Sequence, residues 1–256
     1  MSDGEENRRF GAFLFDLYGT LVDIHTDENQ SSLWKQMAGF AVSRGAAWEA
    51  EALRRAYGDA VREEEARLRL RDRDLPDARP EIDLAPVFAR LYAQKGLSAD
   101  ERLIAETARR FRAASTTHLR VYAGAKELLA ALRQRGRVLL LSNAQSLFTR
   151  PELGLLGLED CFDGIYISSE AGCKKPDPRF FRLALEREGL EAKDCLMIGN
   201  DPLCDGEGAR RVGISSYVIR SALSPREAEG YDQRGMDLRK LQRRLTNSEF
   251  GVRNSE

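Results

Sequence analysis

Three short apolar runs constrain the fold of this chain more than any other feature. They are AFLFDLYG (12–19), RVLLLSN (137–143) and DCLMIGN (194–200), and each ends at a polar residue followed by a turn or loop. Runs of this length and composition are typical of strands that are buried on both faces of a parallel sheet. The sequence therefore predicts a buried parallel sheet.

Two weaker runs and a set of helical patterns extend this prediction. DGIYISS (163–169) and GISSYVIR (213–220) predict further strands, and helical spacing of apolar residues occurs at 123–136, 177–189 and 203–213. Alternation of strands with helices is typical of right-handed crossovers in a doubly wound sheet. We therefore expect an α/β fold with a Rossmann-like parallel sheet.

Residues 24–116 interrupt the alternation. Four segments with helical spacing and many Glu/Arg pairs follow one another there, at 31–45, 46–74, 85–96 and 98–115. This pattern predicts an all-helical module inserted after the first strand. We expect a Rossmann-like core made of residues 1–23 and 117–256, a helical cap made of residues 24–116, and hinges near 22–25 and 114–120.

Composition and charge narrow the classes of partner. The 256 residues carry 40 Lys and Arg against 41 Asp and Glu, so a net charge of −1 gives no overall field that would attract nucleic acid. The longest apolar runs are far shorter than the roughly 20 residues of a membrane span, and the N-terminus MSDGEENRRF lacks the apolar core of a secretory signal. The four cysteines have no paired close spacing, which favours free thiols. We expect a cytoplasmic monomer or homodimer without nucleic-acid or membrane partners.

Chemically active side chains follow the predicted strands. In an open parallel sheet, ligands bind outside the carboxyl ends of the strands. The residues expected there are Asp16, Ser142, Asn143, Lys174, Lys175, Asn200, Asp201 and Asp205. This set suits an anion held beside a divalent cation, because a carboxylate attacks a phosphoryl group once a hard cation such as Mg²⁺ offsets the repulsion.

Each residue has a role in this scheme. Asp201 and Asp205 would hold the cation. A lysine would bind the phosphoryl oxygens, while Ser142 and the backbone amides around Gly19, Thr20 and Asn143 would donate hydrogen bonds as charge develops. Taken singly, the signals also fit ordinary structure, since Asp, Ser and Asn are common caps and turn residues.

In order and spacing, four segments resemble motifs I to IV of the haloacid dehalogenase (HAD) superfamily of hydrolases. The segments are DLYGTL (16–21), LLSN (140–143), KKPDPRFF (174–181) and GNDPLCDGEGA (199–209), and the insert is similar to the helical type 1 cap. The resemblance implies that Asp16 is a covalent nucleophile supported by Thr20. It also implies that Ser142 and Lys175 bind the transferred group, with Gly19, Asn143 and Lys174 beside it. Mg²⁺ would be held by Asp16, by the carbonyl of Tyr18 and by motif IV.

Two positions depart from the motif pattern. Asn200 takes the first acidic position of motif IV and Asp201 follows it, so the choice of metal ligand among Asn200, Asp201 and Asp205 stays open. Phosphatases of the superfamily usually have a second Asp where Tyr18 stands, as general acid and base. A phenol with an ordinary pKa of about 10 is a poorer donor and base at neutral pH.

Tyr18 therefore leaves alternatives open. The 2-haloacid dehalogenases of the superfamily carry Tyr at this position and work without metal, but the acidic pair Asp201 and Asp205 favours a cation. The favoured function is a Mg²⁺-dependent phosphatase that hydrolyses a small phosphorylated molecule through an aspartyl-phosphate. The alternatives are a metal-independent 2-haloacid dehalogenase and a catalytically weak HAD-like binding protein. His25, near the first strand, is a candidate proton donor or an ordinary hinge residue.

Overall fold

The computed structural model describes residues 10–246, so the domain limits predicted at residues 1 and 256 lie outside the described residues. Five parallel strands form the main sheet in the order β5-β4-β1-β6-β7. Their bounds are β1 Ala12–Phe15, β4 Arg137–Ser142, β5 Gly164–Ile167, β6 Cys195–Gly199 and β7 Ser215–Val218. The predicted α/β fold with a Rossmann-like parallel sheet is confirmed.

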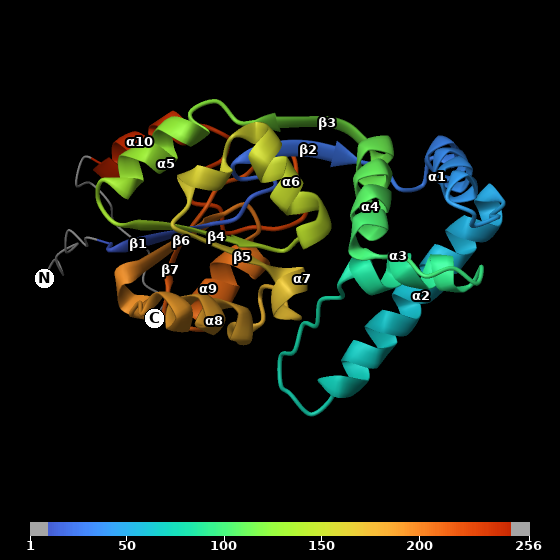
Figure 1. The fold of residues 1–256 in the computed structure, drawn as a ribbon. Helices are drawn as coiled ribbons and strands as arrows, with labels where there is room; N and C mark the ends of the chain where they lie inside the picture. Colours follow the sequence, from blue (N-terminus) through green and yellow to red (C-terminus); the bar gives the residue numbers. More distant parts are fainter. Residues whose placement is uncertain (1–9, 247–256) are drawn as a thin grey trace, which may run out of the picture.

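Helices cover both faces of the sheet (Figure 1). One face carries α5 Ala125–Arg133, α6 Ser146–Leu156 and α10 Leu238–Thr246, and the other carries α7 Ser168–Ala171, α8 Pro178–Glu188 and α9 Gly208–Arg210. Successive side chains of a strand point to opposite faces. Accordingly, Phe13 and Phe15 of β1 belong to the apolar cluster that includes α5 and α10, and Leu14 belongs to the cluster that includes α8. Both faces of the central strand are therefore buried.

Several elements differ from the sequence-based expectation. The strand predicted at 163–169 ends at Ile167, because Ser168 begins α7. The helix predicted at 203–213 consists of a π-helical segment, η3 Pro202–Glu207, followed by α9. Two short 3₁₀ turns, η1 Glu159–Cys161 and η2 Ala192–Asp194, precede β5 and β6. Helix α6 was not predicted from the sequence.

Four helices form the inserted module (Figure 1). They are α1 Ser31–Ser43, α2 Ala50–Arg71, α3 Leu84–Ala93 and α4 Glu101–Ser115. Their apolar faces share one cluster, in which the rings of Trp34, Tyr57, Phe88 and Phe111 lie 5.2–6.0 Å apart between centroids. Aromatic pairs at such distances contribute packing energy beyond their buried area. The same cluster includes Phe148 of α6, so the module packs around its own apolar faces and against the core at this point.

A two-stranded antiparallel ribbon joins the module to the core. It pairs β2 Val22–Thr26 with β3 Thr116–Val121, the two segments where hinges are predicted. Asp23 of β2 accepts hydrogen bonds from the Arg120 guanidinium of β3 at 2.6 and 2.8 Å. The two crossings between the domains are therefore paired with each other rather than being independent flexible links.

A further segment of the insert, residues 72–82, runs along the core and is called the strap here. The N–H of Lys174 donates to the carbonyl of Arg79 at 2.8 Å, and the N–H of Glu81 donates to the carbonyl of Gly172 at 3.3 Å. The buried carboxylate of Asp72 accepts from Arg179 of α8 at 2.9 Å. The insert thus contacts the core at the strap as well as at the ribbon.

Cys161, Cys173, Cys195 and Cys204 are all free. Within residues 10–246, no helix combines the length and the apolar character that a membrane span requires.

Candidate active site

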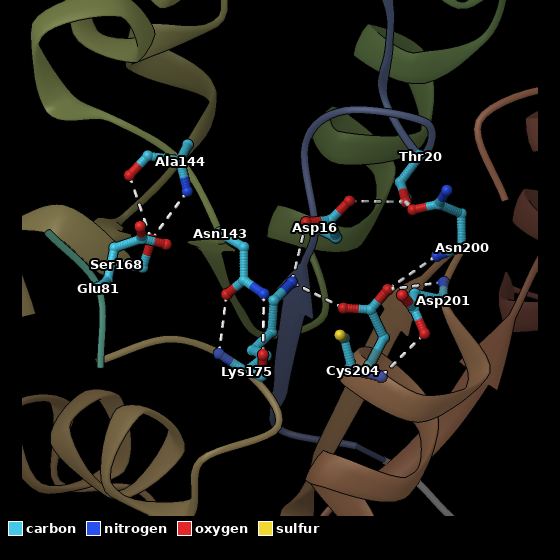
Figure 2. A network of polar contacts seen from close by, with 11 residues as sticks. Asp16, Thr20, Glu81, Asn143, Ala144, Ser168, Lys175, Asn200, Asp201 and Cys204 are labelled. Atoms are coloured by element: carbon cyan, nitrogen blue, oxygen red, sulfur yellow. Dashed lines mark hydrogen bonds and ion pairs between the residues drawn. The ribbon is translucent and has the colours of Figure 1, made fainter. Parts of the chain in front are cut away.

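Asp16 lies directly after β1, in the middle of the sheet. Its N–H donates to the carbonyl of Ile198 at 2.9 Å, so strand pairing fixes the position of the carboxylate. The residue is buried, with 8% of its surface exposed. Oδ1 accepts from Nζ of Lys175 at 2.8 Å, and Oδ2 accepts from the hydroxyl of Thr20 at 3.3 Å (Figure 2). The carboxylate is therefore oriented on both oxygens.

Lys175 lies between two carboxylates. Its Nζ donates to Asp16 at 2.8 Å and to Oδ1 of Asp205 at 2.6 Å, and the residue is only 2% exposed. Asn143 holds its backbone from both sides: the amide nitrogen of Asn143 donates to the Lys175 carbonyl at 2.9 Å, and its Oδ1 accepts from the Lys175 N–H at 2.8 Å (Figure 2). The ends of β4 and the loop before α8 together fix the ammonium group.

Burial and neighbouring charges shift the pKa of Asp16 and of Lys175. Burial raises the pKa of Asp16 to about 6, although the charge of Lys175 opposes this rise. Burial lowers the pKa of Lys175, but Asp16 and Asp205 outweigh burial and hold that pKa above its ordinary value. One ammonium between two carboxylates leaves an excess negative charge in a buried place. A bound cation would reduce that excess.

Asp205 and Asp201 have protein partners. Oδ2 of Asp205 accepts from the backbone N–H groups of Asn200 and Asp201, each at 2.9 Å. Oδ1 of Asp201 accepts from the N–H groups of Leu203 and Cys204, each at 2.9 Å, and so caps η3. Both carboxylates therefore shape the loop that presents the Asn200 side chain to Asp16.

The Asn200 side chain, Asp16 and the Tyr18 carbonyl meet at one point. One side-chain atom of the Asn200 amide lies 3.2 Å from Oδ2 of Asp16 and 3.2 Å from the carbonyl oxygen of Tyr18. The amide nitrogen satisfies both contacts, because it donates to both oxygens. Turned over, the amide presents Oδ1 in the same place, and three oxygens then converge as in the ligand set of a hard cation. In that orientation these residues fit Mg²⁺.

The fit depends on this mixed set of oxygens. Among the described residues, no group of three or more His, Cys, Asp and Glu side chains is arranged to hold a metal ion. The predicted ligand Asp16 is present with the Tyr18 carbonyl and the Asn200 amide, while Asp201 and Asp205 contact the chain itself. A site with one carboxylate among its protein ligands is expected to bind Mg²⁺ more weakly than one with two.

Ser142 ends β4 and is fully buried, with 0% exposure. Within the part of the chain that the structure describes, its Oγ is the buried side-chain polar atom without a hydrogen-bond partner. A buried hydroxyl that lacks a partner costs free energy, which a bound ligand recovers. Its position at the strand end beside Asn143 fits the predicted role of donating to the transferred group.

The remaining predicted residues lie in different surroundings. Gly19 has a φ of +85°, and a Cβ there would come within 2.3 Å of the Asn200 amide, so both the turn and the close approach require glycine. Lys174 faces away from Asp16, because its Nζ pairs with Glu81 at 3.4 Å. The two neighbouring lysines therefore have different partners: Lys175 lies in the buried site beside Asp16, and Lys174 pairs with Glu81 of the strap.

The side chain of Tyr18 points away from Asp16, toward α6. Its hydroxyl donates to Glu152 Oε2 at 2.5 Å and lies 3.1 Å from the hydroxyl of Thr149. Burial and the adjacent Glu152 raise the pKa of Tyr18 well above its ordinary value. The phenol therefore stays protonated at neutral pH.

A cavity of about 500 Å³ lies between the core and the cap. Its walls include Tyr18 and Asn143 from the core side and Glu28 and Arg112 from the insert. His25 also lines it, with Nδ1 2.9 Å from the Thr117 hydroxyl. A cavity of this size holds a small molecule.

Sequence reasoning missed Thr149, Glu152 and Arg112. They come from α6 and α4, and no motif links them to residues 16–21. Pro151 lies inside α6, where proline disfavours a helix, so the usual sequence signal was weak.

A family model of haloacid dehalogenase-like hydrolases matches residues 10–213. The chain belongs to this family.

Two curated relatives resemble parts of the chain. A phosphoserine phosphatase from Thermus thermophilus is 37% identical over 123 residues, which are 47% of this chain and 49% of the relative. A glyceraldehyde 3-phosphate phosphatase from Methanothermobacter thermautotrophicus is 31% identical over 121 residues, 47% of this chain and 54% of the relative. The chain therefore spans about half the length of the curated relatives it matches.

A solved structure supports the fold over a greater length. The 2-haloacid dehalogenase from Pseudomonas syringae superposes with a TM-score of 0.64 at 18% identity, covering 93% of this chain and 99% of that one. At this identity, the likeness concerns the haloacid dehalogenase-like fold alone.

Proposed function

We propose that this hydrolase is a Mg²⁺-dependent phosphatase that acts on a small phosphomonoester through an aspartyl-phosphate on Asp16. The observation that carries the proposal is the convergence of Asp16 Oδ2, the Tyr18 carbonyl and the Asn200 side chain within 3.2 Å contacts. A cation there would offset the negative charge of Asp16 and of a phosphoryl group. The phosphatase names of the relatives from Thermus and Methanothermobacter agree with this substrate class.

The residues have distinct roles in the proposed reaction. Asp16 attacks phosphorus, and the bond from phosphorus to the alcohol oxygen breaks with its electron pair going to the alcohol. Lys175 stays cationic and binds a non-bridging oxygen, and the unpartnered hydroxyl of Ser142 donates to another. Water then attacks phosphorus of the aspartyl-phosphate, which releases inorganic phosphate and restores Asp16.

The leaving alcohol receives little help in this site. The Tyr18 hydroxyl is directed at Glu152 and remains protonated, so it does not deliver a proton toward Asp16. We therefore expect better turnover of esters whose alcohols are acidic, such as nitrophenyl esters, than of alkyl phosphates. The cavity of about 500 Å³, lined by Tyr18 and Asn143 on the core side, has room for a small alcohol.

Tyr18 keeps a second candidate function in view. A halide leaves without a proton, so a phenol at this position suits hydrolysis of a 2-haloacid by Asp16. The two candidates differ in what they need: phosphoryl transfer requires the cation, whereas displacement of halide from a neutral carbon does not.

The test is hydrolysis of p-nitrophenyl phosphate and of 2-chloropropionate, each with Mg²⁺ and with EDTA. The proposal expects release of nitrophenol and phosphate that depends on Mg²⁺. Chloride release in EDTA, with no phosphatase activity under either condition, would identify a dehalogenase. Absence of both reactions would favour a binding protein over either enzyme.

A further inference from the structure

One buried carboxylate joins three separate parts of the molecule. Glu152 of α6 is 6% exposed. Its Oε2 accepts from the hydroxyl of Tyr18 at 2.5 Å, and its Oε1 accepts from Nε of Arg112 at 2.6 Å. Tyr18 belongs to the loop of the nucleophile and Arg112 to α4 of the cap, so the carboxylate bridges the loop, the core and the cap.

Further contacts hold the residues of this bridge. Thr149, one turn before Glu152 on α6, lies 3.1 Å from the Tyr18 hydroxyl. The guanidinium of Arg112 lies over the Tyr18 ring at 5.6 Å and over the Phe148 ring at 5.1 Å. A charge-assisted hydrogen bond and stacked cation contacts in a buried place are stronger than their surface equivalents. The orientation of Tyr18 therefore depends on where α4 sits.

The side chain and the backbone of Tyr18 take part in different contacts, and this links the bridge to the nucleophile. Its side chain is bound to Glu152, whereas its backbone carbonyl lies 3.2 Å from the Asn200 side-chain atom beside Asp16. Rotation of the loop to follow a displaced side chain would move that carbonyl away from Asp16 and Asn200. The contacts at Glu152 thus act on the nucleophile through one residue.

We propose that Glu152 is a positioning residue that couples the seating of the cap to the orientation of Tyr18. With Arg112 in place, the carboxylate fixes the phenol, and the phenol fixes the carbonyl next to Asp16. With the cap displaced, Glu152 loses its cation and the loop loosens. Because coupling is reciprocal, loosening Tyr18 must also loosen α4. The catalytic consequence of this coupling rests on the proposed phosphatase function.

The chain offers a matched control. Glu170 of α7 also pairs bidentately with an arginine of α6, Arg150, at 2.6 and 2.9 Å. Both residues of that pair belong to the core, and its hydrogen bonds involve neither Tyr18 nor Arg112. The pair is more exposed than Arg112–Glu152, with side-chain exposures of 46% and 37% against 18% and 8%. Glu152→Gln and Glu170→Gln therefore each break one arginine–carboxylate pair that involves α6, and only the first breaks the bridge.

The deciding measurement is hydrogen exchange by mass spectrometry on the full chain without substrate. In Glu152→Gln we expect amides of both 17–22 and 101–115 to exchange about tenfold faster or more, with no such change in Glu170→Gln. Faster exchange in 101–115 alone would show an ordinary ion pair and overturn the proposal. Unchanged exchange in both segments would overturn it as well.

Two milder variants keep the test decisive if Glu152→Gln does not fold. Tyr18→Phe deletes one hydroxyl in the core and should speed exchange in 101–115, and Arg112→Met alters the cap and should speed exchange in 17–22. If either effect is confined to its own segment, the coupling is refuted.

Steady-state kinetics provide a second, independent test of the positioning role. With p-nitrophenyl phosphate, Glu152→Gln should lower kcat about tenfold and change KM by less than threefold, because the loop that carries Asp16 is disturbed more than the cavity. Loss confined to KM would contradict the positioning role. If the wild-type chain hydrolyses no phosphomonoester, the proposed function fails, while the exchange measurement still decides the coupling.

Discussion

The substitution Asn200→Asp tests the cation site most sharply, because its cost in stability should shrink as Mg²⁺ is added. The side-chain atom of Asn200 lies 3.2 Å from Oδ2 of Asp16 and from the Tyr18 carbonyl. A second carboxylate there would face Asp16 without a cation between them. Two like charges 4 Å apart repel by about 4 kcal/mol at an effective dielectric constant of about 20.

Protonation limits this cost, since burial already raises the pKa of Asp16 to about 6. At pH 8 in EDTA we expect Asn200→Asp to lower the free energy of unfolding by about 2–4 kcal/mol, which is roughly 5–15 °C in Tm for a chain of this size. With Mg²⁺, the second carboxylate becomes a ligand. Affinity tighter by about tenfold or more should then raise the variant's Tm more than that of the wild type.

Thermal unfolding followed by circular dichroism, in EDTA and across a Mg²⁺ titration, measures both effects. Asn29→Asp is the control, because it adds the same charge at an exposed position of the insert. It should leave the response to Mg²⁺ as it is in the wild type. Equal Mg²⁺ shifts in wild type and Asn200→Asp, or no loss of Tm in EDTA, would refute a cation site at these three oxygens.

Three further outcomes follow from the same geometry. Asp16→Asn should reduce phosphomonoester hydrolysis at least about 10³-fold with an unchanged circular dichroism spectrum; near-normal turnover would exclude a covalent role. In the metal-free wild type, folded Asp16 keeps its proton from pH 3.8 to about 6 while the unfolded chain releases it. The free energy of unfolding, from urea titrations, should therefore fall by up to about 3 kcal/mol as pH rises through this window, and Asp16→Asn should lack this fall. Gly19→Ala should destabilise by about 1–3 kcal/mol in the same titrations and remove the Mg²⁺ response, because its φ is +85° and its Cβ would strike Asn200; an unaltered Mg²⁺ response would contradict this.

Local patterns made much of the core predictable. The apolar runs that became β1, β4 and β6 are buried on both faces, so their composition alone reveals strands, and the polar residue after each run marks the edge of the sheet where ligands bind. The positions of Asp16 and Ser142 follow directly from this rule. Helical spacing revealed the helices of the insert for the same reason, since each hides one apolar face.

Contacts between distant segments could not be predicted in this way. The β2–β3 ribbon pairs residues about a hundred positions apart, and its strands are half exposed, so neither carries a clear apolar pattern. The Arg112–Glu152 pair is one of many possible pairings in a chain rich in both charges. The direction of the Tyr18 phenol likewise depends on α6, a helix that the residue pattern around Pro151 did not predict.

Lys174 shows the limit of motif reasoning at the level of single residues. The motif places it beside Lys175, but consecutive residues of an irregular loop need not face the same way. Here the first lysine pairs with Glu81 and the second with Asp16. Only the tertiary structure separates the two.

The strap bears on how such an insert can be exchanged between proteins. Exchange of the insert at β2 and β3 would replace residues 24–116. It would also remove the hydrogen-bond partners of the core residues near α8. The N–H of Lys174 and the carbonyl of Gly172 would lose Arg79 and Glu81, and Arg179 would lose Asp72. A transplanted insert must therefore include a segment equivalent to 72–82. In chimeras without such a segment, the backbone groups and the arginine at this edge of the core lack hydrogen-bond partners from the insert.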